Sequence, residues 1–267
     1  MPRGTIYYIT KGMPIGFGAT AHVERLPSGH VIKSPKLNPY WPHAEEDHCR
    51  NMRTEAEVYR RIEGCPHFPK MIDWDSDSCC LTIEYLENGS LGDYMETASP
   101  VSLETQRRWG LHLATALKAL HAANVIHCDL APRNLLLDKS LHLYVADFAG
   151  SSVDGSTPSV APGPRFHPPG APYRAAKSSD DLFALGSVLY LIASGHEPYP
   201  DLEEEEIERL FGSGTFPDVS HLVLGALIRG CWEGTVGSAE EAMASLSVLH
   251  NGEHETTQLD HQGQNGG

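Results

Sequence analysis

Apolar and polar residues alternate over the first third of the chain in a pattern that predicts short strands. Residues 5–34 contain three apolar stretches separated by Gly and Pro (TIYYITKG, IGFGATAHVERL and GHVIKSP), which indicates three strands joined by tight turns. Residues 35–43 carry three prolines and are expected to form a loop. From about residue 44 to 62, apolar residues recur at helical spacing, which predicts a helix. Two more strand-like stretches, KMIDW and CCLTIEYL, complete a small sheet within the first 86 residues.

The pattern becomes helical after residue 86. A helix is expected to begin after Ser102, a suitable N-cap, and its apolar stripe consists of Trp109, Leu113, Leu117 and Leu120. Residues 150–178 are rich in Ser, Pro and Gly without periodicity, which predicts a long loop of the kind that often carries function. Residues 178–194 are apolar on all sides and predict a buried helix, and two amphipathic helices follow.

These elements predict an α+β fold with two lobes around a cleft, which suits a chain of 267 residues. The smaller lobe, rich in strands and with one long helix, would cover residues 5–86. The larger, mainly helical lobe would cover residues 87–250. Residues 251–267 have almost no apolar content and are expected to be disordered.

The composition is that of a soluble globular protein, with 40% apolar and 21% charged residues. The longest apolar run, residues 182–193, has 12 residues, whereas a bilayer span needs roughly 20. The start of the chain lacks the apolar region of a signal peptide. We therefore expect a protein of the cytoplasm or nucleus that is neither secreted nor transmembrane.

The formal net charge of −15 argues against nucleic-acid binding, because the phosphates would repel this protein, and it also disfavours anionic membranes. The same charge favours a basic peptide or protein partner, although plain solubility explains it equally well. The six cysteines form no CxxC pair and no zinc-site spacing, which fits free thiols in a reducing compartment. We expect a monomer that binds neither nucleic acid nor membrane.

One stretch, HCDLAPRNLLLD at residues 127–138, places an acid, a guanidinium and an amide directly before an apolar run. Asn134 follows Asp129 after five residues, and Asp147 follows it after 18. Two adjacent loops can bring these three side chains to one point. Carboxylate and amide oxygens are ligands that suit Mg²⁺. Asn134 and Asp147 are therefore expected to hold the metal, while Asp129 is left to orient or deprotonate a hydroxyl.

These motifs resemble the signature of the protein kinase family. HCDLAPRN resembles the catalytic loop HRDLxxxN, and ADFAG resembles the DFG segment. Residues 15–23 (IGFGATAHV) resemble the glycine-rich loop, in which Gly16 and Gly18 let backbone amides approach phosphates closely. VIK, which ends at Lys33, resembles the strand motif VAIK. Because the elements follow the family's order over about residues 12–245, the chain is identified as a member.

The resemblance implies where a nucleotide would lie. Lys33 would contact the α- and β-phosphates, and Glu55 would fix Lys33, with Glu57 as the alternative partner. Ile83 would be the gatekeeper beside the adenine. The remaining expected nucleotide-binding residues are Ile15, Gly16, Gly18, Val23, Val31, Glu84 through its carbonyl, Leu86 through its amide, and one of Leu135 and Leu136, for which we take Leu136.

The resemblance also assigns roles around the catalytic loop. Asp129 would accept or orient the proton of the hydroxyl, an effect typically worth about 10²–10⁴-fold in rate. Arg133 would neutralise γ-phosphate charge, or it would merely pair with a neighbouring acid. His127 is expected to be a core histidine that braces the loop, and Asp181, in DDLFALG, to brace it from the buried helix.

Several positions depart from the family pattern. Ala21 replaces the third loop glycine, and Ala149 replaces the glycine of DFG. Cys128 stands where many members have an arginine that pairs with a phosphorylated activation loop, so we expect activity that does not depend on that phosphorylation. Residues 167–169 (HPP) stand in place of Ala-Pro-Glu, and the stretch after CW lacks the arginine that normally pairs with that glutamate.

The function that the resemblance implies is an ATP- and Mg²⁺-dependent protein kinase that phosphorylates Ser or Thr hydroxyls, with basic proteins as possible substrates. A pseudokinase, which binds nucleotide or only forms a scaffold, is the first alternative. A small-molecule kinase of the aminoglycoside or choline type is the second. Suitable residue types at all five chemical positions favour activity, namely Lys33, Glu55, Asp129, Asn134 and Asp147. The choice between Ser/Thr and Tyr stays open, because LAPRN places its arginine as tyrosine kinases do.

Overall fold

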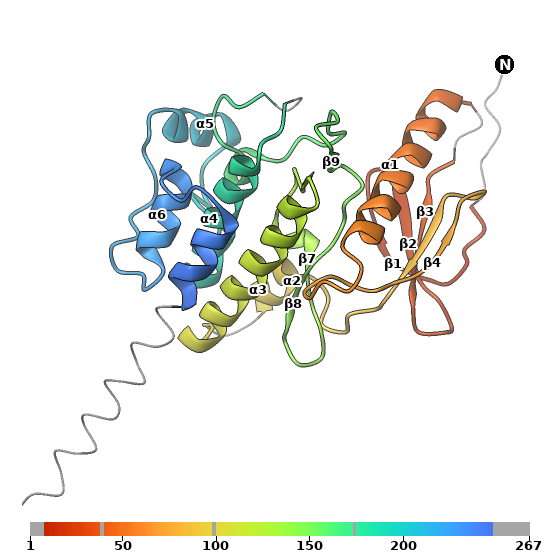
Figure 1. The fold of residues 1–267 in the computed structure, drawn as a ribbon, viewed down its shortest axis with the longest axis horizontal. Coiled ribbons are helices and arrows are strands. Elements are labelled where there is room, and N and C mark those ends of the chain that lie inside the picture. Colours follow the sequence, from red (N-terminus) through yellow and green to blue (C-terminus); the bar gives the residue numbers. More distant parts are fainter. Residues whose placement is uncertain (1–7, 38–39, 98–99, 173–174, 248–267) are drawn as a thin grey trace, which may run out of the picture.

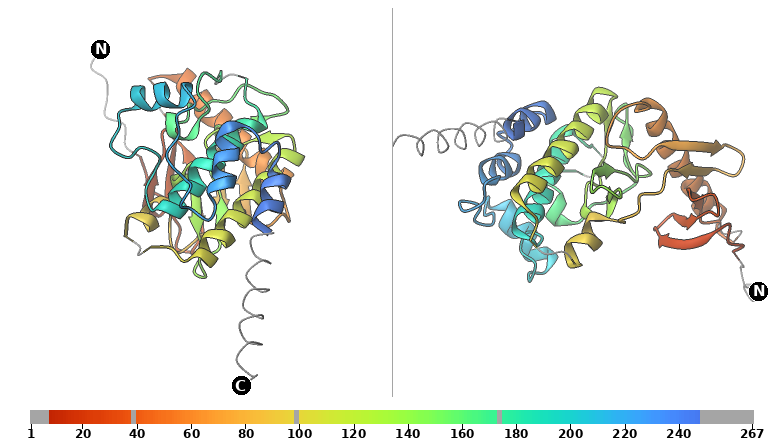
Figure 2. Two further views of the ribbon diagram at one scale, coloured as in Figure 1. Left: turned by 90° about the vertical axis from the view of Figure 1, so that its left-hand side faces the viewer. Right: turned by 90° about the horizontal axis from the view of Figure 1, so that it is seen from below.

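The computed structural model describes residues 8–37, 40–97, 100–172 and 175–247, and these residues form two lobes (Figure 1). A small lobe of strands with one long helix lies at one end, and a larger, mainly helical lobe lies at the other. The right-hand view of Figure 2, from below, shows the same separation. The predicted α+β fold is confirmed. The predicted disordered tail at 251–267 lies outside the described residues.

Five antiparallel strands form the sheet of the small lobe, in the spatial order β1-β2-β3-β5-β4. Their bounds are Met13–Phe17 (β1), Ala21–Arg25 (β2), Val31–Pro35 (β3), Met71–Asp75 (β4) and Cys80–Ile83 (β5).

One strand boundary differs from the sequence-based expectation. The stretch IGFGATAHVERL, expected as a single strand, forms parts of both β1 and β2, with the turn at residues 18–20. Residues 8–12, expected to be part of the first strand, are irregular. A side chain holds this segment in place of a strand partner, because the Tyr8 hydroxyl and the Lys11 N–H both donate to the buried carboxylate of Glu24.

The register of the sheet gathers the residues expected around a nucleotide on one face. Val23 pairs with Lys33 across β2 and β3, and Lys33 pairs with Leu81 across β3 and β5. Val31 pairs with Ile83. Cross-strand partners share a face, as do alternate residues of one strand. The five side chains therefore belong to the same face of the sheet.

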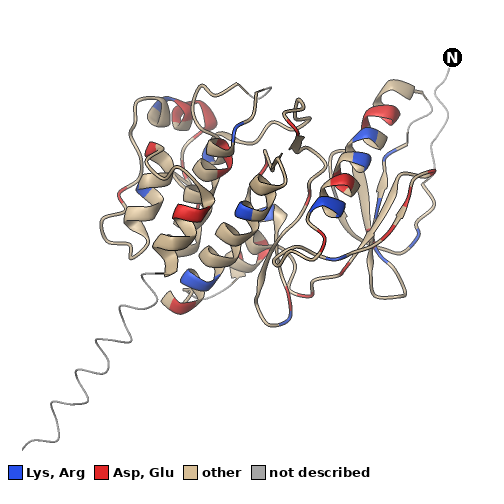
Figure 3. Ribbon diagram, viewed as in Figure 1, with Lys and Arg blue, Asp and Glu red and all other residues tan. Residues whose placement is uncertain are grey.

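Helix α1 (Pro42–Arg61) packs against this sheet (Figure 1). It begins two residues before the expected start, and a proline suits the first turn of a helix. Its buried residues are Met52, Glu55, Ala56, Val58 and Tyr59. Acidic and basic residues are interspersed along its length (Figure 3). A carboxylate within the buried set needs a partner, because an unpaired buried charge is strongly destabilising.

The larger lobe contains most of the helices. These are α2 (Leu91–Thr97), α3 (Leu103–Ala122), α4 (Ser178–Ser194), α5 (Glu204–Gly212), α6 (Gly225–Glu233) and a last helix from residue 239 to the end of the described residues at 247. Two short antiparallel pairs join β6 (Val125–Ile126) to β9 (Ser152–Val153) and β7 (Leu135–Leu137) to β8 (Leu143–Val145).

Helices α3 and α4 behave as their sequences predicted. The Ser102 hydroxyl accepts a hydrogen bond from the Thr105 N–H, which caps α3. The expected apolar stripe of α3 is inaccessible to solvent. Helix α4 is buried from residue 181 to 192 and packs against α3 and α6. Within the described ranges, no helix is long and apolar enough to cross a membrane.

Candidate active site

The side chain of Lys33 joins the two lobes. Its ammonium nitrogen lies 2.7 Å from each carboxylate oxygen of Glu55 on α1 and 2.6 Å from Oδ1 of Asp147. The Lys33 and Glu55 side chains are buried, with 9% and 0% exposed, whereas 47% of the Asp147 side chain is exposed. Glu55 on α1 thus fixes the ammonium of Lys33, and the carboxylate of Asp147 remains partly accessible to solvent.

The charges of this cluster stabilise one another. Burial alone would lower the pKa of Lys33, but the carboxylates of Asp147 and Glu55 reverse that effect and raise this pKa above its usual value. The ammonium of Lys33 lowers the pKa of Asp147. Burial raises the pKa of Glu55, and Lys33 opposes that rise. Lys33 therefore stays positively charged in the folded protein.

Glu55 rather than Glu57 faces Lys33. The two residues are separated by two positions and so point in different directions from a helix. Glu57 lies on the outer side, where its carboxylate pairs with Arg61 at 2.9 Å.

The loop after β6 positions Asp129 through bonds to its own neighbours. The Asn134 amide nitrogen donates to the backbone carbonyl of Asp129 at 2.8 Å and to its Oδ2 at 2.9 Å. Arg133 donates to Oδ1 of Asp129 at 2.5 Å. Both side chains come from the 3₁₀ turn η1 (Pro132–Asn134). The Arg133 side chain is 60% exposed, so its guanidinium can leave this pair for a bound anion.

His127 is buried inside this loop and uses both ring nitrogens in hydrogen bonds. Its Nε2 lies 3.1 Å from the carbonyl of Ala146, and its Nδ1 lies 3.2 Å from the N–H of Asp129. Its backbone N–H donates to Asp181 at 2.9 Å. The ring is inaccessible to solvent. These contacts connect the Asp129 loop to the segment that carries Asp147.

Phe148, next to Asp147, is inaccessible to solvent and links three parts of the structure. Its ring packs edge-on against Tyr59 of α1 (5.2 Å between centroids), Phe68 (5.9 Å) and His127 (5.4 Å). Aromatic pairs prefer such edge-to-face arrangements. The position of Asp147 is therefore coupled to that of α1 through a buried neighbour.

The hairpin of β7 and β8 brings Asn134 next to the segment that carries Asp147. Leu135 pairs with Val145, and the Ala146 N–H donates to the Asn134 carbonyl at 2.9 Å. No group of three or more His, Cys, Asp or Glu side chains in the described ranges could hold a metal ion. A site of one amide and one carboxylate oxygen suits Mg²⁺ if phosphate oxygens and water complete it. The donor set fits the expected ion on chemical grounds.

The residues expected around the adenine base differ in how far they are exposed to solvent. Val31, Ile83 and Leu86 are buried, and Val23 is half-buried. Ile15 is 42% exposed at the edge of β1. The segment after β5 is held by Glu84, whose N–H donates to the Lys70 carbonyl and whose carboxylate accepts the Lys70 N–H.

Within β7, the structure separates Leu136 from its neighbours. Leu135 and Leu137 are inaccessible to solvent, whereas Leu136 is half-buried. Successive strand residues point to opposite faces. Leu136 is therefore the leucine that faces away from the core of the larger lobe.

Comparison with known proteins identifies the family. A sequence model described as "Protein kinase domain" matches residues 10–220, well over half of the chain. This chain belongs to the protein kinase family. Among curated proteins, it is 30% identical over 172 residues to the serine/threonine-protein kinase ULK3 of Homo sapiens (59% of this chain, 35% of that protein). It is 26% identical over 186 residues to 3-phosphoinositide-dependent protein kinase 1 of Homo sapiens (66% of this chain, 31% of that protein). The chain spans about a third of the length of these curated relatives.

Arg165 makes contacts that no motif in the sequence indicated. It lies in the 3₁₀ turn η2 (Pro164–Phe166), beside the HPP segment that lacks the family's glutamate. Its guanidinium donates to the carbonyls of Pro198 (3.0 Å), Tyr199 (3.0 Å) and Leu202 (2.8 Å). An arginine fork suits such multiple acceptors. Arg165 thus anchors the 3₁₀ turn η2 to residues 198–202. The only sign of this role in the sequence was a single arginine in a stretch of Pro and Gly.

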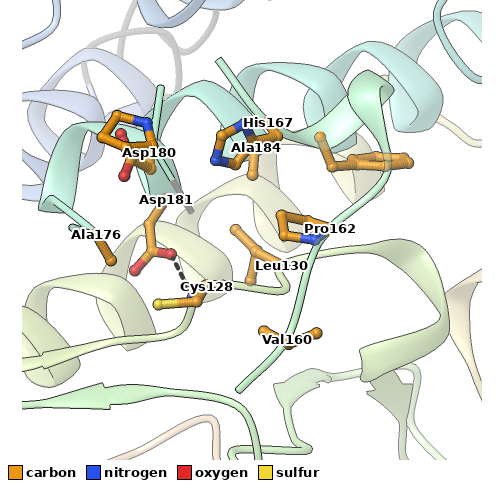
Figure 4. A pocket seen from close by; sticks show the side chains of 11 residues that line it. Cys128, Leu130, Val160, Pro162, His167, Ala176, Asp180, Asp181 and Ala184 are labelled. Carbon is orange, nitrogen blue, oxygen red and sulfur yellow. Dashed lines mark hydrogen bonds between the residues drawn. The ribbon is translucent and has the colours of Figure 1, made fainter. Parts of the chain in front are cut away.

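A pocket opens beside Cys128 in the kinase's larger lobe, between the Asp129 loop, the segment after residue 160 and α4 (Figure 4). Its lining is mostly apolar, with His167, Asp180 and Asp181 as the polar members. As far as the structure describes this lining, it contains no Lys or Arg; Tyr173 and Arg174 lie outside the described residues. Burial raises the pKa of the Cys128 thiol to about 12, so this side chain carries no charge at neutral pH.

Proposed function

We propose that this chain is an active protein kinase that transfers the γ-phosphoryl group of ATP, with Mg²⁺, to Ser or Thr hydroxyls of proteins. The observation that carries the proposal is the meeting of Lys33 with Glu55 and Asp147 between the two lobes. Phosphoryl transfer asks the protein mainly for positioning and charge neutralisation. A buried, permanently charged lysine beside an accessible carboxylate supplies both.

Each residue would act through contacts that the structure makes available. Lys33 would bind the α- and β-phosphates while Glu55 keeps it in place. Asn134 and Asp147 would hold Mg²⁺, which neutralises phosphate charge when bound. Asp129 would orient the substrate hydroxyl and accept its proton, and Arg133, which is exposed, would turn to the γ-phosphate.

The nucleotide would lie against the face of the sheet that carries Val23, Val31 and Lys33. The amides around Gly16 and Gly18 would approach the phosphates. The base would lie between a roof of Ile15, Val23 and Val31 and a floor formed by Leu136, next to Ile83. The Glu84 carbonyl and the Leu86 amide would bind the edge of the adenine, the former accepting and the latter donating. We place this catalytic unit within residues 5–250, with the lobes dividing after residue 86.

Ser/Thr specificity is proposed from the relatives, one of which is named a serine/threonine-protein kinase. The net charge of −15 supports basic protein substrates. We further propose a monomer of the cytoplasm or nucleus.

A nucleotide-binding scaffold without transfer is the second candidate. The observation that favours it is that both carboxylate oxygens of Asp129 already accept hydrogen bonds, from Arg133 and Asn134. These two bonds occupy two of the roughly four acceptor sites of the carboxylate, so fewer remain for a substrate hydroxyl.

One experiment separates the two candidates. The chain is incubated with labelled ATP and Mg²⁺, a generic basic protein and a peptide library, and ATP binding is measured in parallel by calorimetry. We expect Asp129→Asn to lower transfer by about 10²–10⁴-fold and to leave ATP binding intact. Transfer that survives this substitution would reject Asp129 as the base. Binding without transfer by the unsubstituted chain would support the scaffold, and absence of both would reject the proposed nucleotide site.

A further inference from the structure

Arg61, in the last turn of α1, forms a two-pronged ion pair with Asp154, 93 residues later. Its Nη1 lies 2.9 Å from Oδ1 and its Nη2 lies 2.7 Å from Oδ2. Nη1 also donates to the carbonyl of Ala123, at the end of α3, at 3.2 Å. Asp154 follows β9, seven residues after Asp147. The pair therefore ties α1 to the larger lobe and to the segment that continues from Asp147.

The backbone of Asp154 is itself held in place. Its φ is +52°, a conformation that Asp tolerates better than most residues, and its N–H donates to the Asn124 carbonyl at 2.9 Å. The hydrogen bonds from Arg61 lower the pKa of Asp154, so the carboxylate stays ionised at neutral pH. The acid is thus presented to α1 on a fixed turn.

A second contact joins the same two elements on the other side of Glu55. The Ser159 hydroxyl donates to the amide oxygen of Asn51 at 2.9 Å, and the Ser159 N–H donates to the Gly150 carbonyl at 3.2 Å. Asn51 lies one helical turn before Glu55, and Arg61 lies six residues after it. The segment after Asp147 therefore contacts α1 on both sides of the residue that fixes Lys33.

These contacts need no phosphate. The residues that line the pocket beside Cys128 offer, in the part of the chain that the structure describes, no cation to a phosphorylated loop. Arg61 already has a permanent anion in Asp154. An arginine fork that binds a carboxylate with two parallel bonds is specific in geometry as well as in charge.

We propose that Arg61 and Asp154 are positioning residues that hold α1 where Glu55 meets Lys33, in place of a phosphate-dependent tie. That the place of α1 matters for catalysis rests on the proposed kinase function. That Arg61 and Asp154 hold α1 in this place does not. The pair is partly exposed, with 27% of the Arg61 side chain and 57% of the Asp154 side chain accessible. Such a pair shifts a two-state equilibrium by up to about fivefold.

The test measures how often Lys33 leaves Glu55. A small amine-reactive reagent, trinitrobenzenesulfonate, is added to the full chain, and modification of Lys33 is followed by peptide mass spectrometry. We expect Asp154→Ala to raise the rate of Lys33 modification up to about fivefold. Asp154→Asn, which keeps the size but removes the charge, should do the same. Salt should accelerate the modification in the unsubstituted chain more than in either variant, because salt screens the pair.

Asp47→Ala is the matched control. Asp47 forms a 2.7 Å ion pair with Arg50 on the same helix and is 60% exposed. Its removal should leave Lys33 modification unchanged. Equal modification rates for Asp154→Ala and the unsubstituted chain would overturn the proposal, as would an equal increase in Asp47→Ala. Unfolding midpoints of all variants show whether a changed rate reflects global stability instead, which would also overturn it.

Phosphatase treatment supplies the second arm. Lys33 modification and transfer activity should both be unchanged after treatment of the purified chain, because Asp154 needs no modification to be charged. An increase in Lys33 modification on dephosphorylation would overturn the proposal. If the chain transfers no phosphate at all but Asp154→Ala still exposes Lys33, the positioning role stands and the kinase proposal fails.

Discussion

The carboxylate of Asp181 fixes the backbone of Cys128, 53 residues earlier in the chain. Its Oδ1 accepts the Cys128 N–H at 3.0 Å, and its Oδ2 accepts the His127 N–H at 2.9 Å. Cys128 has a φ of +68°, a left-handed conformation that is unfavourable for a residue with a side chain. Asp181 is 1% exposed. A buried charge at the start of α4 thus stabilises the strained turn that leads into Asp129.

Removal of that charge should harm both stability and activity. In Asp181→Asn, one amide oxygen replaces two acceptors, so a buried backbone N–H loses its partner. We expect the free energy of unfolding to fall by about 2–4 kcal/mol, measured by urea denaturation, and transfer activity to fall at least tenfold. Asp180→Asn is the control, because the Asp180 carboxylate accepts hydrogen bonds from the neighbouring Lys177 N–H and Ser179 hydroxyl at the start of α4, and it should cost about 1 kcal/mol. Equal losses in the two variants would contradict the role of Asp181.

The glycines of the first hairpin should matter for the nucleotide and not for the fold. A methyl group on Gly16 would lie 3.6 Å from the Val23 side chain, an ordinary contact. Gly16→Ala should therefore leave the unfolding midpoint nearly unchanged and weaken ATP binding on the order of tenfold, because the methyl group would separate the amides from the phosphates.

Gly150→Ala provides the opposite case. A methyl group on Gly150 would lie 2.5 Å from Cβ of Val160, so the segment after Asp147 would have to move. We expect this variant to lower the unfolding midpoint measurably.

Unchanged ATP affinity in Gly16→Ala, determined by calorimetry, would show that the loop does not cover the phosphates.

Arg165 should contribute to the stability of the larger lobe. Arg165→Met keeps most of the aliphatic stem but removes three hydrogen bonds to carbonyls. We expect a loss of about 2–3 kcal/mol in the free energy of unfolding and faster proteolysis between residues 150 and 172. Arg209→Met removes an arginine that is 65% exposed and pairs locally with Glu206, so it should cost clearly less than Arg165→Met. A loss in Arg209→Met as large as in Arg165→Met would contradict the anchoring role.

His112 should make the protein sensitive to acid. Burial, together with the neighbouring charges of His67, His142 and Arg108, lowers the pKa of His112 from 6.5 to about 3, and Asp138 opposes this shift weakly. Between these values the unfolded chain binds a proton that the folded chain does not. The free energy of unfolding should therefore be constant above pH 6.5 and fall below it, by less than about 1.4 kcal/mol per pH unit from this partly exposed group.

The contribution of His112 can be isolated by substitution. The amide oxygen in His112→Asn can replace Nδ1 as acceptor of the Leu143 N–H, which lies 3.1 Å away. Urea denaturation at pH 7.5, 6 and 5 should show a shallower pH dependence for this variant. A slope identical to that of the unsubstituted chain would assign the acid sensitivity to other groups.

Local patterns in the sequence were sufficient for the elements and for the order of the motifs. Ser102 caps α3 and the stripe from Trp109 to Leu120 is buried, because helical periodicity and capping depend on residues within a few turns. The apolar residues on all sides of the stretch 178–194 likewise indicated a buried helix. The motif around Asp129 could be found because its residues are neighbours in the chain.

Only the tertiary structure decided which of several similar residues acts where. Glu55 and Glu57 are chemically alike, and the packing of α1 on the sheet turns the first toward Lys33 and the second toward Arg61. The pleat of β7 likewise separates Leu136 from Leu135. The contacts of Arg61 with Asp154 and of Arg165 with the loop before α5 join residues far apart in the chain. Such pairs have no periodicity, so nothing local in the sequence encodes them, and they exist only once the chain has folded.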